Sequence, residues 1–192
     1  MDNFTFIGID PGTSNIGISI WTIGIESLEI KKVQAFTFDT MDLNHRDQEL
    51  EESHGVRFSR LVTMRKEIAA ILRQIRPTSV ACESPFYFSK RPGAFAPLVE
   101  VLYVLKCAVF DYDQTAPFIT YDPSSIKNSI GASGNANKEI VKNTMKVLNP
   151  ILLTTEYLRG LDEHSIDAIA VGYCHYRVYI LDEDKAKLKT KV

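Results

Sequence analysis

The sequence predicts an α/β fold in which a mixed β-sheet of about five strands is flanked by helices. Two observations lead to this prediction. The chain opens with two β-rich runs joined by a tight turn, and segments of helix and strand character then alternate along it. With 192 residues, 45% of them hydrophobic, the chain is long enough to bury one core. We therefore expect a single domain over residues 1–181.

The first two predicted strands enclose a turn that begins with an aspartate. Residues 4–9 and 16–21 are rich in β-branched and aromatic side chains, and Pro11 and Gly12 lie between them. Asp10 is therefore expected at the end of the first strand. A third strand is expected within residues 28–38. The acidic segment 39–55, which has few apolar residues, is expected to be a mobile loop.

The middle of the chain predicts a helix, a short strand and a second, more apolar helix. Apolar residues recur at helical spacing over 56–75, and Pro77 follows. The run 79–82 predicts a strand that ends at Glu83, because Ser84 and Pro85 follow directly. Residues 94–110 are apolar on nearly every side. The helix predicted there should be covered on two faces, most simply by a dimer interface.

The C-terminal half predicts one more strand and three helices. Residues 118–121 form the fifth strand, and Asp122 with Pro123 begins a short helix that carries Lys127. A loop rich in Gly, Asn and Ser over 131–137 leads into a basic helix over 138–148. The last strong helix is expected over about residues 162–178, and the charged tail 182–192 is expected to be frayed.

Composition excludes several classes of protein. The three cysteines lie far apart with no CxxC spacing, so neither a disulfide framework nor a zinc site is indicated, and a reducing cytoplasm fits best. No run approaches the ~20 apolar residues of a membrane span, and the N-terminus lacks the pattern of a signal peptide. The net charge of −2 does not indicate a nucleic-acid partner. Any such partner must therefore be bound by local positive charge.

Side chains that can bind a hard cation occur at three separate places: Asp10, Glu83, and the pair His164 and Asp167. The pair is three residues apart and projects from one side of a helix, while Asp10 and Glu83 can meet if their strands are neighbours. Clustered carboxylates repel one another unless divalent cations neutralise them. Mg²⁺ is the implied cofactor, with Mn²⁺ as its substitute. Two ions about 4 Å apart would suit hydrolysis of a phosphodiester.

Each of these residues also has an ordinary structural explanation. Asp10 precedes Pro-Gly, as many turn residues do, and Glu83 and Asp167 could be solvated acids at a strand end and on a helix. Asp162 is better explained as the N-cap of the last helix than as a metal ligand. It is the combination of the positions, rather than any one of them, that favours a metal site.

Four motifs in order resemble the RuvC family of Holliday junction resolvases. Residues 6–17, FIGIDPGTSNIG, look like its first strand, turn and second strand, and Glu83 in CESPF resembles its second acid with the following aromatic residue. PSSIK, followed by GNANK, resembles its basic stretch that contacts DNA, and DEHSIDAIA over residues 162–170 resembles its C-terminal acidic helix. The motifs cover most of the chain.

This resemblance implies a ribonuclease H-like fold, a homodimer, and Mg²⁺-dependent catalysis by Asp10, Glu83, His164 and Asp167. The implied activity is that of a crossover junction endodeoxyribonuclease, which cuts four-way junctions and other branched DNA and leaves 5′-phosphate and 3′-hydroxyl ends. The family has Asp or His at the position of His164. Phe86 matches its aromatic wedge at the junction centre.

Basic residues near these motifs are candidate DNA contacts. Lys127 and Lys138 match family lysines that hold the DNA backbone, and Lys142 extends the same helix face at a spacing of four residues. Without the resemblance, Lys142 would be explained as a solvated helix residue. Lys90 and Arg91 follow three aromatic residues and could hold phosphates while the aromatic rings stack on bases.

Two other functions remain open at this stage. An actin-like ATPase or kinase could use the turn after Asp10 to bind phosphate, although 192 residues leave little room for its second phosphate loop and adenosine subdomain. A ribonuclease H-like nuclease that processes RNA would carry the same acidic residues. Incubation with branched DNA, duplex DNA and RNA/DNA hybrid distinguishes these alternatives.

Overall fold

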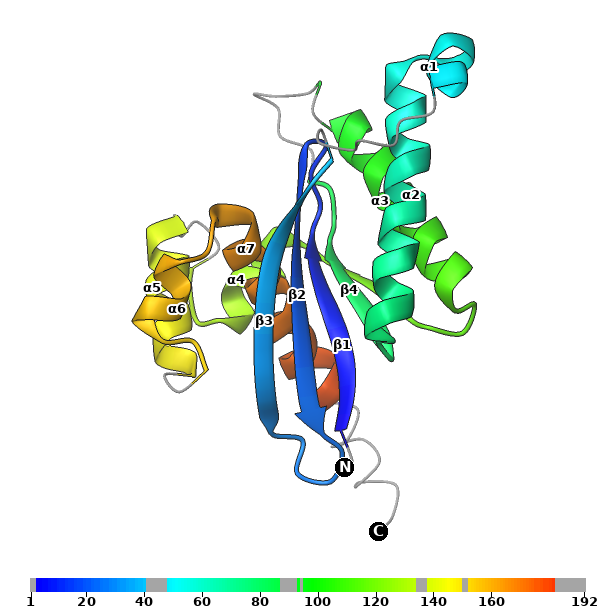
Figure 1. The fold of residues 1–192 in the computed structure, drawn as a ribbon. Coiled ribbons are helices and arrows are strands. Elements are labelled where there is room, and N and C mark those ends of the chain that lie inside the picture. The colour runs from blue at the N-terminus through cyan, green and yellow to red at the C-terminus, as the bar shows by residue number, and fades with distance from the viewer. Residues whose placement is uncertain are drawn as a thin grey trace.

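A computed structural model describes residues 3–40, 48–86, 93, 95–133, 138–149 and 152–181. Its centre is a five-stranded sheet in the order β3-β2-β1-β4-β5 (Figure 1). The strands are β1 (Asn3–Asp10), β2 (Asn15–Gly24), β3 (Ile30–Asp39), β4 (Ser79–Glu83) and β5 (Phe118–Tyr121). β2 pairs antiparallel with β1 and β3, whereas β4 pairs parallel with β1 and β5. The sheet is therefore mixed, as the sequence predicts.

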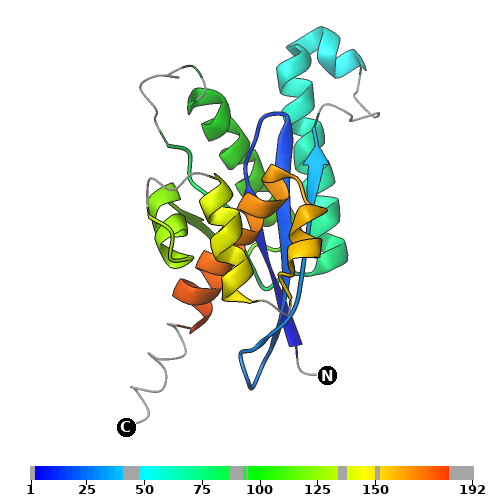
Figure 2. The ribbon, with the colours of Figure 1, turned by 90° about the vertical axis from the view of Figure 1, so that its left-hand side faces the viewer.

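Helices cover both faces of this sheet. One face carries α2 (Val56–Ile75) and α3 (Phe95–Tyr112), with α1 (Gln48–His54) preceding α2. The other carries α4 (Pro123–Ser129), α5 (Lys138–Leu148), α6 (Thr155–Arg159) and α7 (Glu163–His175), followed by a π-helical segment, Tyr176–Ile180. The views in Figures 1 and 2 agree on this three-layer arrangement. None of the described helices combines the length and apolar character needed to span a bilayer.

The alternation of side chains along β1 explains why its apolar run is nearly continuous. Phe6 packs into the core beneath α4 to α7, whereas Ile7 and Ile9 belong to the core between the sheet and α2 and α3. Successive side chains of a strand point to opposite faces, so a strand covered on both sides must be apolar at almost every position. β2 follows the same rule, with Trp21 in the first core and Ile18 in the second.

Helix α7 lies unusually close to β1 and β2, because glycines face it. A Cβ on Gly8 would lie 2.5 Å from the backbone nitrogen of Gly172, and a Cβ on Gly17 would lie 2.0 Å from the carbonyl oxygen of His164. Real Cβ atoms do not approach other atoms so closely, so a larger residue would push the helix away. Ser19 adds a hydrogen bond of 2.7 Å to the carbonyl oxygen of Ala168. The height of α7 above the sheet is thereby set.

A histidine near the end of α7 is fully buried in a small polar network. His175 Nε2 lies 2.8 Å from Ser79 Oγ, and its Nδ1 lies 3.0 Å from the hydroxyl of Tyr121. Its ring stacks on Tyr179 and meets the ring of Phe6 edge-on. Burial lowers the pKa of His175 to about 4. The imidazole is therefore neutral at physiological pH and links α7 to β4 and β5.

The structure differs from the sequence prediction in the acidic segment 39–55. Asp39 ends β3, and residues 48–54 form α1 instead of continuing a loop. Glu49 and Glu51 lie in the first turn of α1, where negative charge is favoured, and Glu is a good helix former. Gly55, with φ 85°, separates α1 from α2. Residues 41–47 and the tail 182–192 lie outside the described part of the chain, so the predictions for them stay predictions.

Candidate active site

Two carboxylates end adjacent parallel strands. Ile9 of β1 is paired with Cys82 of β4, so Asp10 and Glu83, one residue further along, reach the same edge of the sheet. Both residues are partly buried. Burial raises the pKa of the Cys82 thiol, and the nearby charges of Asp10 and Glu83 raise it further. The two carboxylates therefore lie close to the same buried thiol at one edge of the sheet. The sequence predicted that they could meet if their strands were neighbours.

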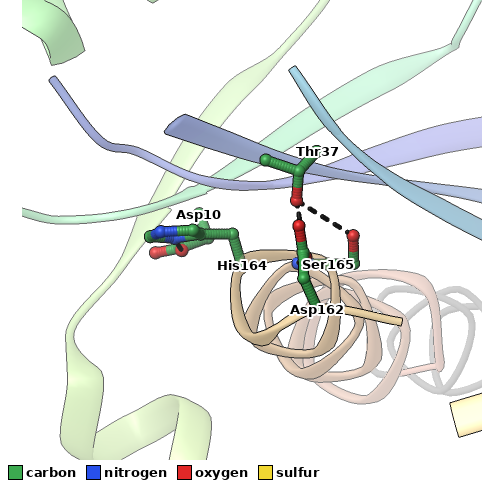
Figure 3. Close-up of polar contacts among 5 residues, drawn as sticks. All are labelled: Asp10, Thr37, Asp162, His164 and Ser165. Atoms are coloured by element: carbon green, nitrogen blue, oxygen red, sulfur yellow. Dashed lines mark hydrogen bonds and ion pairs between the residues drawn. The ribbon is translucent and has the colours of Figure 1, made fainter. Parts of the chain in front are cut away.

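Helix α7 brings His164 to this edge. His164 Nδ1 lies 2.9 Å from Asp10 Oδ2, and their side chains are 36% and 15% exposed (Figure 3). An ionised carboxylate only accepts hydrogen bonds, so Nδ1 is the donor and Nε2 remains available as a ligand or base. Asp167 is partly buried on the same helix, three residues later. The contact joins residues separated by 154 positions in the sequence.

Asp10, Glu83 and His164 lie at one edge of the sheet and Asp167 follows on α7, but the four predicted ligands do not surround a single point. Among the residues that the structure describes, no three His, Cys, Asp or Glu side chains lie close enough together to hold one metal ion. Asp10 and His164 are in contact, and Glu83 lies at the end of the neighbouring strand β4. The donor set, three carboxylates and an imidazole, has the chemistry of a site for a hard divalent cation.

Asp162 caps α7, as the sequence predicted. Its side chain accepts a hydrogen bond of 2.8 Å from the backbone nitrogen of Ser165. It also accepts one of 2.6 Å from the hydroxyl of Thr37 on β3. Burial acts to raise the pKa of Asp162, but the hydrogen bonds from Thr37 and Ser165 outweigh it, and the pKa lies below its usual value. Thr37 was not singled out from the sequence, because nothing near it along the chain marks it.

The candidate DNA-binding residues lie on several elements. Lys127 is on α4 and Lys142 on α5, and both are partly buried. Phe86 follows β4, and its side chain is 66% exposed, as a residue that inserts into DNA requires. Lys138 begins α5, but its side chain is not among those described. Lys90 and Arg91 lie outside the described residues, so their predicted role stays a prediction.

The start of α4 is held by a second aspartate cap. Asp122 accepts hydrogen bonds from the backbone nitrogens of Ser124 and Ser125 and from both of their hydroxyls. These hydrogen bonds hold the pKa of Asp122 well below its usual range. The carboxylate therefore stays ionised and stabilises the helix that carries Lys127.

A largely apolar groove of about 800 Å³ runs along α2 and α3. Its apolar lining comes from Phe58, Leu61, Val62, Val99, Tyr103, Val104 and Cys107. Tyr103 is 70% exposed, and Phe110 further along α3 is 58% exposed. These exposed side chains support the prediction that residues 94–110 have a second apolar face. Ala94 itself lies outside the described residues.

Comparison with known proteins identifies the family. Residues 6–175 match the family model "Crossover junction endodeoxyribonuclease RuvC". The chain belongs to this family. A curated relative, the crossover junction endodeoxyribonuclease RuvC of Cytophaga hutchinsonii, is 28% identical over 170 residues, which cover 88% of this chain and 74% of the relative. Membership of the family implies dependence on a divalent metal ion.

Solved structures confirm the predicted fold class. Thermus thermophilus RuvC, 21% identical, aligns with a TM-score of 0.62 over 90% of this chain and 93% of that chain. A T. thermophilus RuvC structure in complex with Holliday junction substrate, 18% identical, aligns with a TM-score of 0.60 over 90% and 92%. The ribonuclease H-like sheet flanked by helices, predicted from the sequence, is therefore the fold of this RuvC-family chain.

Proposed function

We propose that this RuvC-family protein resolves four-way DNA junctions by metal-dependent hydrolysis of phosphodiesters, leaving 5′-phosphate and 3′-hydroxyl ends. The observation that carries the proposal is the meeting of Asp10 and His164, 2.9 Å apart, beside the strand that ends at Glu83. The motifs that contain these residues resemble the acidic-site motifs of the family, whose model matches residues 6–175. Other branched DNA is included in the proposed substrate range. The proposed location is the cytoplasm, of a bacterium or, for a viral protein, of its host.

We assign metal binding to Asp10, Glu83, His164 and Asp167. Mg²⁺ is the proposed ion, two per site, with Mn²⁺ as a substitute, because carboxylate-rich sites favour these cations. Bound there, such ions supply an activated water and stabilise charge on the scissile phosphate. Asp10 orients the His164 ring through the Nδ1 hydrogen bond, which leaves Nε2 as the ring nitrogen that could bind a metal ion. Glu83 adds negative charge from β4.

We assign DNA binding to Lys127, Lys138, Lys142, Lys90, Arg91 and Phe86. Lysines on α4 and α5 would neutralise phosphates, which supplies affinity without base recognition. This local charge explains how a chain with a net charge of −2 can bind DNA. Phe86 is exposed and follows Glu83, the last residue of β4, by three residues, so it could act as a wedge near the proposed site.

We assign the groove along α2 and α3 to a homodimer interface. Junction resolution requires two symmetrically placed cuts, and a dimer with a two-fold axis presents two identical sites. The exposed Tyr103 lines this groove, and the exposed Phe110 lies further along α3; an exposed apolar surface of this kind is one that a partner covers. Two ion pairs, Arg57 with Glu100 and Arg65 with Asp111, tie α2 to α3 beside it.

A cleavage assay on defined substrates tests the proposed activity. A labelled four-way junction, a flap, a linear duplex and an RNA/DNA hybrid are incubated with the protein in Mg²⁺, in Mn²⁺ or in EDTA, with Asp10→Asn as the control. We expect the junction to be cut in pairs of nicks that DNA ligase can reseal. Cutting should require Mg²⁺ or Mn²⁺ and should be absent with Asp10→Asn. Equal cutting of linear duplex, or cutting by Asp10→Asn, would contradict the proposal. Preference for the hybrid would favour RNA processing, and ATP turnover without cutting would favour a kinase-like protein.

A further inference from the structure

The first turn of α7 rests on one row of residues that crosses the sheet. Asp10 of β1 is paired with Gly17 of β2, and Gly17 is paired with Thr37 of β3. The backbone of α7 contacts the middle of this row, because a Cβ on Gly17 would lie 2.0 Å from the carbonyl oxygen of His164. Asp10 and Thr37 therefore lie on either side of the point where the helix touches the sheet.

Side chains of α7 contact both ends of the row. Figure 3 shows His164 with Asp10 on one side of the helix and Asp162 with Ser165 beside Thr37 on the other. The hydroxyl of Thr37 donates to Asp162 Oδ1 at 2.6 Å, and Ser165 Oγ lies 3.1 Å from Thr37 Oγ1. The hydroxyl of Ser165 thus lies within hydrogen-bond distance of Thr37, and it also contributes to lowering the pKa of Asp162. Ser165 is almost completely buried, whereas Asp162 is exposed, so the contacts of Thr37 extend from the surface to the buried side of the helix.

We propose that Thr37, Asp162 and Ser165 form a clamp that positions His164 and Asp167 for catalysis. The inference rests on the proposed function and adds three positioning residues to it. Asp162 and Ser165 alternate along α7 with the proposed catalytic side chains, so any rotation or lift of the first turn moves both sets together. Thr37 connects this turn to β3, the strand furthest from Glu83 in the row of β3, β2, β1 and β4.

The physical need for such a clamp follows from where the catalytic residues lie. The ends of helices fray, because their terminal N–H groups have no partners within the helix. Asp162 satisfies the Ser165 N–H, which stabilises the turn, but a cap by itself does not fix the turn against the sheet. The Thr37 hydroxyl supplies that connection. A helix held only at the Asp10 side could pivot about Gly17 and carry Asp167 away from the carboxylates it must join.

Replacement of Thr37 tests this role. Thr37→Val has nearly the same shape but lacks the hydroxyl, and Thr37→Ser keeps the hydroxyl. Thr154→Ala is the matched control, because Thr154 caps α6 through the backbone nitrogen of Tyr157 and is not part of the site. Each variant is measured in two ways: hydrogen exchange of the backbone amides of residues 163–167 in metal-free protein, and single-turnover junction cleavage as a function of Mg²⁺ concentration.

We expect Thr37→Val to raise amide exchange in the first turn of α7 about fivefold, the effect of one lost hydrogen bond. Its cleavage rate should fall about tenfold with a higher Mg²⁺ requirement and unchanged junction affinity, as for residues that orient metal ligands. Thr37→Ser should restore both, and Thr154→Ala should change neither. Unchanged exchange in Thr37→Val, or the same losses in Thr154→Ala, would overturn the clamp. If neither the unaltered protein nor any variant cuts junctions but amide exchange in α7 still rises in Thr37→Val, the proposed function fails while the contact of Thr37 with α7 stands.

Discussion

The buried His175 predicts a specific dependence of stability on pH. Burial lowers its pKa from 6.5 to about 4 in the folded chain, whereas the unfolded chain keeps the ordinary value. Between these values the unfolded state binds more protons than the folded state, so acid favours unfolding. The difference of about 2.5 between the two pKa values corresponds to a loss of about 3 kcal/mol, complete only below about pH 4. At about pH 5 the loss is about 2 kcal/mol relative to pH 7.5.

Urea unfolding at a series of pH values measures this loss. His175→Gln retains an amide donor and acceptor but does not titrate, so its free energy of unfolding should fall less between pH 7.5 and 5, by about 2 kcal/mol. Tyr121→Phe is the control, because it removes one hydroxyl partner of the ring and leaves the imidazole in place. That variant should be less stable at every pH yet keep the pH dependence of the unaltered protein. Parallel pH curves for His175→Gln and the unaltered protein would refute the reasoning.

Five further predictions concern the proposed activity and the proposed dimer. Glu83→Gln should abolish cleavage while junction binding measured by gel shift persists, because a lost carboxylate weakens metal binding and reduces repulsion of phosphate. His164→Asp should retain cleavage, since a carboxylate can serve there; a folded but inactive variant would show that the imidazole is required. Lys127→Ala should weaken junction binding and reduce its salt slope by about one unit in titrations at several salt concentrations. Phe86→Ala should keep junction affinity but slow single-turnover cleavage. Tyr103→Asp should sediment as a folded monomer of one chain mass that nicks junctions singly, and a dimer would contradict the assigned interface.

Much of the secondary structure could be predicted because it depends on neighbouring residues. β-rich and apolar runs located β1, β4 and β5, and the helical spacing of apolar residues located α2, whose predicted bounds are those of the structure. Asp162 was predicted as an N-cap for the same reason, since a cap acts on a backbone N–H three residues away. The helix α1 was missed because its sequence is polar except for Leu50, and low apolar content alone does not separate an exposed helix from a loop.

The site needed contacts that no local pattern specifies. The spacing of His164 and Asp167 along a helix was visible in the sequence, but which acid they would meet was not. Thr37 reaches Asp162 across 125 positions, and His175 finds Ser79 across 96. Side chains of this kind have no distinctive neighbours, because their partners are chosen by the packing of the helix on the sheet.

The order of the five strands, the location of two acids at strand ends and the family with its ordered motifs could all be predicted from the amino-acid sequence. The three-dimensional structure was needed to show that β1 and β4 are neighbours, that Asp10 meets His164, and that Thr37 contacts the other side of α7. Local patterns specify elements because backbone hydrogen bonds and side-chain alternation act over a few residues. The pairing of distant elements is specified by burying both faces of the sheet at once, and this condition is met only when the whole chain has folded.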